Sequence, residues 1–114
     1  LFIIPLVLMS LVSSPSWALS MDDLVKRGGR TAGLWYEKFT ATPFTGEVDE
    51  GKERGPIKNG KREGSWEDYY DNGQLRSKGD YKNDKAEGFW EYYNPNGSIW
   101  NWTGTYKNGV KVSD

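Results

Sequence analysis

The chain of 114 residues contains no cysteine and no histidine. Without cysteine it can form no disulfide, no thiolate metal site and no cysteine nucleophile. Without histidine it lacks the commonest general base, the commonest metal ligand and the usual pH switch, so a Ser–His–Asp site cannot be built. We therefore predict a protein that is not an enzyme and has no cofactor-binding or metal-binding residues. Any catalysis would depend on carboxylates, lysine or tyrosine alone.

An excess of charge of either sign is also lacking, because 15 Lys and Arg residues face 16 Asp and Glu residues. A dedicated nucleic-acid binder usually carries a basic excess, and so does a protein held to anionic lipid. We expect no nucleic-acid partner. The basic residues Lys52, Arg54, Lys58, Lys61 and Arg62 cluster loosely, and the acidic residues Asp49, Glu50, Glu53 and Glu63 are interleaved with them, which predicts a mixed solvated surface. The length allows one domain.

The first 18 residues are predicted to be a helical signal peptide. Residues 1–12 form an almost unbroken apolar run, which is short for a membrane span. Ser16 and Ala18 then provide the small residues that signal peptidase requires, which predicts cleavage after Ala18. The protein would then be periplasmic or extracellular. The alternative is an uncleaved anchor, which would be its one contact with the membrane.

The main signal is an internal repeat with an offset of 24 residues. Residues 64–75 read GSWEDYYDNGQL, and residues 88–99 read GFWEYYNPNGSI. Each segment is followed by a half-unit of the form Gly-x-Tyr-Lys-Asn, and a related half-unit precedes the first. One extra residue lies between Ile99 and Gly104. The repeat positions predicted to be structural are Gly64, Trp66, Tyr69, Gly73, Tyr81, Gly88, Trp90, Tyr93, Gly97 and Tyr106.

Five Asn-Gly or Asn-Asp pairs punctuate this region, starting at residues 59, 72, 83, 96 and 108. Asn-Gly favours the type I′ turn, which joins two strands in a hairpin. The runs between the turns are rich in Trp, Tyr and Thr, which suit strands. We therefore predict an all-β fold: a single-layer, twisted antiparallel sheet of tandem β-hairpins. Trp66, Tyr69, Trp90 and Tyr93 are expected to form its core, and the extra residue in 100–103 is expected to form a β-bulge.

The segment before the repeats is less regular. Residues 20–27 predict one or two helical turns, with Ser20 as the N-cap and Asp23 completing a capping box. Residues 34–39 and 44–48 predict two strands joined around Pro43. The expected organisation is a signal peptide (1–18), a short helix and linker (19–33), a degenerate capping hairpin (34–48) and the repeats (49–114, with units near 55–63, 64–87 and 88–111).

The pattern G-x-W-E-x-Y-Y-x-N-G-x-L, followed by G-x-Y-K-N-G, resembles the MORN-repeat variant of bacterial proteins. The resemblance covers about two thirds of the chain, from residue 44 to residue 111. It implies an elongated sheet of hairpins, links to scaffolding or membrane association, and no catalytic residues. Some bacterial relatives are labelled antitoxin components, which an export segment speaks against. The WEYYNPNGSI stretch also resembles the choline-type cell-wall-binding repeat, whose unit is shorter.

Four aromatic residues depart from the strict repeat and are the candidate partner or glycan surface: Tyr70, Tyr92, Trp100 and Trp102. Exposed rings could stack on sugars or dock a partner. The acidic pairs, such as Glu67 with Asp68, are expected to be solvated, because neighbouring strand residues point to opposite faces. The function expected is an exported protein-interaction or scaffold module. The alternatives are an envelope-glycan binder and an antitoxin-like component.

Overall fold

The computed structural model describes residues 19–28 and 33–114, so the expected signal segment lies outside the described residues. The described chain is all-β apart from one 3₁₀ turn at Met21–Asp23. Its strands are β1 (Leu24–Arg27), β2 (Leu34–Glu37), β3 (Gly46–Val48), β4 (Glu53–Lys58), β5 (Lys61–Arg62), β6 (Gly64–Tyr69), β7 (Leu75–Lys82), β8 (Lys85–Tyr92), β9 (Gly104–Lys107) and β10 (Val110–Ser113).

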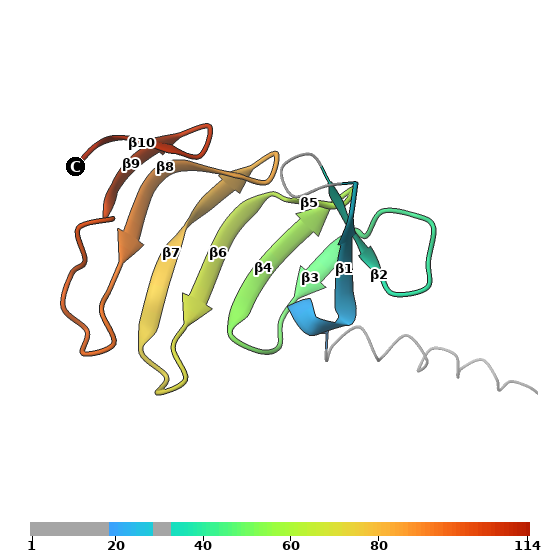
Figure 1. Ribbon diagram of the computed structural model, residues 1–114, viewed down its shortest axis with the longest axis horizontal. Helices are drawn as coiled ribbons and strands as arrows, with labels where there is room; N and C mark the ends of the chain where they lie inside the picture. The colour runs from blue at the N-terminus through green and yellow to red at the C-terminus, as the bar shows by residue number, and fades with distance from the viewer. Residues whose placement is uncertain (1–18, 29–32) are drawn as a thin grey trace, which may run out of the picture.

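Most strands lie side by side in one open antiparallel sheet, and β1 and β2 form a separate hairpin at its N-terminal end (Figure 1). The sheet order is β10–β9–β8–β7–β6–β4–β3, and β5 pairs with the end of β4. All pairings are antiparallel, as expected for connections too short to cross over. The prediction of an antiparallel sheet built from hairpins is therefore confirmed.

The turns form two rows, one at each end of the strands, and the two rows differ in the kind of turn. These turn-bearing edges are distinct from the outermost strands, β3 and β10. At one edge, Asn59-Gly60, Asn83-Asp84 and Asn108-Gly109 all have positive φ angles, as a type I′ turn requires. At the other edge, the loops at Asn72-Gly73 and Asn96-Gly97 are wider, and only their glycines have positive φ. In these loops the Asn side chain accepts a hydrogen bond from the backbone two residues on. The expectation of five equivalent type I′ turns was therefore wrong for two of them.

The centre of the sheet is held by two tryptophans that lie over glycines. A Cβ atom at Gly55 would lie 2.5 Å from Cγ of Trp66, and one at Gly79 would lie 2.5 Å from Cγ of Trp90. Each indole also donates to a carbonyl of the underlying strand, Trp66 to Pro56 at 2.9 Å and Trp90 to Asp80 at 3.0 Å. Glycine is therefore required at both positions because a side chain would occupy the space of the ring.

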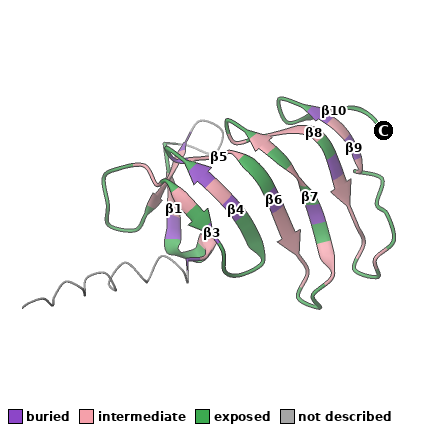
Figure 2. Cartoon of the chain, turned by 180° about the vertical axis from the view of Figure 1, so that it is seen from behind, coloured by how far each residue is buried: buried purple, intermediate pink, exposed green. Residues whose placement is uncertain are grey.

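Further rings extend this packing along the sheet. Tyr81 makes edge contacts with both tryptophans, at centroid distances of 6.1 and 5.0 Å. Tyr92 stacks on Trp90 at 5.9 Å and lies 6.1 Å from Tyr106. Figure 2 shows buried stretches recurring from strand to strand across the sheet, with exposed positions toward the loops. The core is therefore a line of aromatic rings along one face, which continues to Ile57 and Val48.

Tyr69 and Tyr93 do not belong to this core, contrary to expectation. The pairing of β6 with β7 shifts by one residue between Asp68 and Tyr69. The Tyr69 hydroxyl donates to Glu67 at 2.9 Å, and that of Tyr93 donates to Glu91. Because side chains two residues apart on a strand share a face, both tyrosines lie opposite the buried tryptophans. The places expected for them are taken by Tyr81 and Tyr92.

The extra residue after Ile99 forms a turn rather than the expected bulge. The amide of Thr103 donates to the carbonyl of Trp100 at 3.0 Å, and the Thr103 hydroxyl donates to the carbonyl of Tyr92 at 2.9 Å. Pairing then resumes with Gly104 opposite Trp90. The turn accommodates the inserted residue because the Thr103 hydroxyl bonds to both backbone groups of Tyr92, in the place that the backbone of a paired strand would otherwise take.

The N-terminal segment contains less helix than expected. The Ser20 capping box is confirmed, with the Ser20 amide donating to Asp23 at 2.9 Å and the Asp22 amide donating to the Ser20 hydroxyl at 3.2 Å. The helix, however, ends after three residues, and Leu24–Arg27 is a strand paired with β2. Tertiary pairing with Leu34–Glu37 overrides the local helical preference here.

The hairpin expected at 34–48 does not form either. Leu34–Glu37 pairs with β1, and Gly46–Val48 pairs with β4. The β1–β2 hairpin is joined to the sheet by a backbone bond from the Trp35 amide to the Gly60 carbonyl at 2.8 Å. The Gly60 amide in turn donates to the carbonyl of Phe44, in the segment between β2 and β3, at 2.7 Å. The sequence pattern assigns residues 24–27 to the helix, and it therefore does not reveal them as the strand that pairs with Leu34–Glu37.

Candidate interaction surfaces

The four candidate aromatic residues do not form one surface. Tyr92 is half-buried in the line of core rings, where burial raises its pKa to about 12. Tyr70 is also half-buried, and its hydroxyl donates to the carbonyl of Tyr93 at 2.8 Å. Both residues therefore serve the packing of the sheet.

Trp100 and Trp102 are the exposed members of the set, with 38% and 52% of their surfaces accessible. Their ring centroids are 6.4 Å apart, and the ring planes are nearly perpendicular, at 87°. A row of coplanar rings, which would fit a chain of sugar rings, is therefore not formed by these four residues. Trp100 and Trp102 instead lie close together in the loop between β8 and β9.

A second group of exposed residues, which the sequence analysis missed, consists of apolar side chains on β8, on β10 and in the loop between β8 and β9. We call Phe89, Ile99, Val110 and Val112 the C-terminal apolar residues; between 56% and 70% of each is accessible. Phe89 was detectable in principle, because the aligned residue of the preceding segment is Ser65. Among the described residues, β10 is the outermost strand of the sheet and pairs on one side only, with β9.

A third surface is the edge that carries the type I′ turns. We define the tight-turn edge as residues 58–63, 82–87 and 107–110, and it contains six basic and three acidic residues. Asp84 is nearly buried and bonded to Arg62 at 2.5 Å and to Lys26 at 3.2 Å. The carboxylate of Glu87 accepts from the Asn108 amide at 3.2 Å, and Glu63 likewise accepts from the Asn83 amide. All three carboxylates are thus committed to internal contacts.

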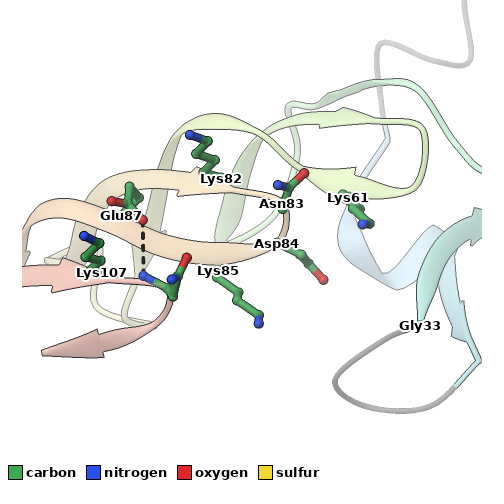
Figure 3. A pocket seen from close by; sticks show the side chains of 9 residues that line it. Gly33, Lys61, Lys82, Asn83, Asp84, Lys85, Glu87 and Lys107 are labelled. Atoms are coloured by element: carbon green, nitrogen blue, oxygen red, sulfur yellow. Dashed lines mark hydrogen bonds between the residues drawn. The ribbon is translucent and has the colours of Figure 1, made fainter.

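A hollow of about 630 Å³ opens along this edge beside the Asn83-Asp84 and Asn108-Gly109 turns (Figure 3). Four lysines line it: Lys61, Lys82, Lys85 and Lys107. Figure 3 shows their side chains spread apart around the turns, with Lys82 and Lys85 pointing in different directions. The hollow is therefore open and basic.

One carboxyl group on the aromatic face has an altered pKa. Burial raises the pKa of Asp68, although the Arg76 guanidinium 3.7 Å away lowers it. Asp68 lies opposite Glu53 in the pairing of β4 with β6, a neighbour that the sequence analysis did not identify. Glu67 is turned to the other face, where it binds Tyr69, so the adjacent pair Glu67 and Asp68 is divided as expected.

Residues 19–28 and 33–114 contain no group of three or more acidic side chains arranged to hold a metal ion. The same ranges hold no helix long and apolar enough to cross a membrane.

The fold defines a class: this is a small all-β protein with a mostly antiparallel sheet. No family model matches the chain, and neither the curated proteins nor the solved structures contain a match.

Proposed function

We propose that the protein is an exported repeat protein of the MORN-variant type that acts as a protein-interaction or scaffold module. The repeat pattern of residues 64–75 and 88–99 supports this assignment. In both aligned segments the tryptophan covers a glycine of the neighbouring strand and donates to the following carbonyl. Export is inferred from the apolar run and the Ser16 and Ala18 site alone. It predicts that the mature protein, recovered from the periplasm or medium, begins at Leu19.

The observation that carries the binding role is the exposed C-terminal end of the sheet. Strand β10 has an open hydrogen-bonding edge, and Val110 and Val112 on it are 64% and 59% accessible. An open edge beside apolar side chains is the usual template for adding a strand from a partner. We therefore infer that the partner is a protein that supplies an extended, apolar segment.

A capture experiment from the cell-envelope fraction tests this proposal. Immobilised wild-type protein is expected to retain one protein in stoichiometric amount, and the double variant Phe89→Ser/Val112→Lys is expected to lose it. Phe89→Ser is conservative for the fold, because Ser65 occupies the aligned position. The matched control is Lys38→Ser/Lys52→Ala, which changes two exposed residues at the other end of the molecule. Equal capture by both double variants would contradict the proposal.

The second candidate function is binding of an envelope glycan, and it rests on Trp100 and Trp102. Two exposed, perpendicular rings can hold one sugar ring in the angle between them. This candidate predicts retention of the protein on isolated cell wall, and loss of that retention in Trp100→Ala/Trp102→Ala. The protein-binding candidate predicts that this variant captures its partner normally.

A further inference from the structure

We propose that the tight-turn edge binds a flexible anionic polymer carrying phosphate or carboxylate groups. The sequence showed only a chain of near-zero net charge, with acidic and basic residues alternating along the segment 49–63. The hairpins distribute these charges unevenly. Asp49, Glu50 and Lys52 lie with Asp71 at the edge that carries the wide loops. Lys58 and Lys61 lie at the tight-turn edge with Lys82, Lys85 and Lys107, and the three carboxylates of that edge already accept internal bonds.

Lysines face each other across two of the hairpins, and this arrangement does not stabilise the fold. Lys58 pairs with Lys61, and Lys82 pairs with Lys85, directly across their hairpins. Like charges opposite each other on a sheet are destabilising. Within the described ranges, no hydrogen bond or ion pair holds the ammonium groups of Lys61, Lys82, Lys85 or Lys107. An anionic ligand would relieve this repulsion, because it would neutralise both members of each pair.

The spacing of the lysines favours a polymer over a single ion. Neighbouring strands lie about 4.8 Å apart, so tight turns recur about every 10 Å along the edge. This is close to the distance over which salt screens charges, about 8–10 Å at physiological ionic strength. The fields of successive turns therefore overlap. The hollow is open rather than enclosed, so a single small anion would keep most of its water, whereas a chain can contact several turns at once.

The kind of side chain favours a flexible, non-protein chain. Lysine ammonium groups are mobile point charges and do not impose the planar geometry that arginine imposes on a bound carboxylate. The tight-turn edge consists of closed hairpin tips, so it offers no open strand on which a peptide could form a ladder of backbone bonds. The turn residues Asn59, Asn83 and Asn108 add polar groups beside the lysines. Such a surface suits the anionic groups of a flexible chain that is not a peptide.

Binding of two defined polymers to the purified protein tests the proposal. The probes are inorganic polyphosphate and polygalacturonate, with polyglutamate as the protein-like comparison. The edge variant is Lys82→Gln/Lys85→Gln/Lys107→Gln, which removes three exposed charges from the edge. The control variant is Lys38→Gln/Lys52→Gln/Lys78→Gln, which removes three exposed charges from elsewhere. Thermal melting of both variants establishes that they fold.

Wild-type protein is expected to bind polyphosphate, polygalacturonate or both, with an affinity that falls as salt rises. The edge variant is expected to lose about tenfold or more in affinity and to show a weaker salt dependence, whereas the control changes less than about twofold. Phosphate and carboxylate sources are distinguished by which probe binds more tightly. The proposal is overturned if neither polymer binds, if both variants lose the same affinity, or if polyglutamate binds more tightly than either.

Discussion

The indole of Trp90 occupies the space into which a side chain at Gly79 would project, and its Nε1 donates to the carbonyl of the next residue, Asp80, at 3.0 Å. Trp66 stands in the same relation to Gly55 and Pro56. The ring and the glycine therefore form one packing unit, in which neither residue can be changed without the other.

Replacing Gly79 with alanine is expected to destabilise the protein by about 1–3 kcal/mol, because the added methyl group must displace the Trp90 ring or bend strand β7. The measurement is the free energy of unfolding in urea. Asp80→Ala is the matched control, since Asp80 is adjacent and exposed, and it is expected to change stability by less than about 0.5 kcal/mol. Equal stability of the two variants would contradict the account of the core.

Removing the ring itself has a larger effect. Trp90→Ala is expected to cost about 3–5 kcal/mol, because Trp90 is buried against Gly79 and contacts both Tyr81 and Tyr92. Trp102→Ala, at a ring that is half exposed, is expected to cost less than about 1 kcal/mol. Chemical denaturation of the two variants separates structural rings from surface rings. A severe loss in Trp102→Ala would show that its ring supports the turn at 100–103.

Asp84 holds the N-terminal hairpin to the sheet, and its replacement tests that link. Asp84→Asn keeps the shape and tolerates the positive φ of this turn position, but it weakens the bonds to Lys26 and Arg62. We expect a loss of about 1–3 kcal/mol, because both bases are only about 20% exposed. Asp71→Asn removes a fully solvated pair with Lys52 and serves as the control. Limited proteolysis should cleave the region of β1 and β2 faster in Asp84→Asn alone.

Alkaline pH is expected to weaken the fold through Tyr92. Burial, the largest cause, raises its folded-state pKa from 10 to about 12, with Tyr106 adding to the shift. A raised tyrosine pKa means that the folded state favours the neutral phenol. This contribution is therefore complete below pH 10 and is lost as pH rises through about 12. Tyr92→Phe should lose less stability than wild type between pH 10 and 12 in thermal melts. Identical pH profiles would show that Tyr92 does not control this loss.

Much of the fold was predictable because its determinants are local. The Asn-Gly pairs specify where the chain reverses, and Trp66 and Trp90 recur where two strands must pack together. The faces of Tyr69 and Tyr93 were also predictable, because each lies three residues after a core tryptophan and alternation along a strand places it on the opposite face. Strand β1 was not predictable in this way. Its local sequence also fits a helical turn, and only pairing with Leu34–Glu37 decides between them.

The candidate surfaces were harder to predict than the fold. Tyr92 and Trp100 are both aromatic residues outside the strict repeat, yet one packs in the core and the other remains exposed. The charge of the tight-turn edge depends on which turns lie together at one end of the strands, and the pairing of the strands determines this. The linear order of Asp49, Lys58 and Lys61 therefore could not reveal it.

The ion pairs of Asp84 also bear on which end of the sheet unfolds first. Asp84 bonds to Lys26 and Arg62, which are distant from it and from each other in the sequence. These ion pairs therefore hold the N-terminal end of the sheet together. At the other end of the described sheet, β10 pairs with β9, its immediate predecessor in the chain. Fraying should therefore begin at β10 and travel inward, and amide hydrogens of β9 and β10 should exchange with solvent before those of β4. A partner strand seated on β10 would stop this unravelling at its starting point.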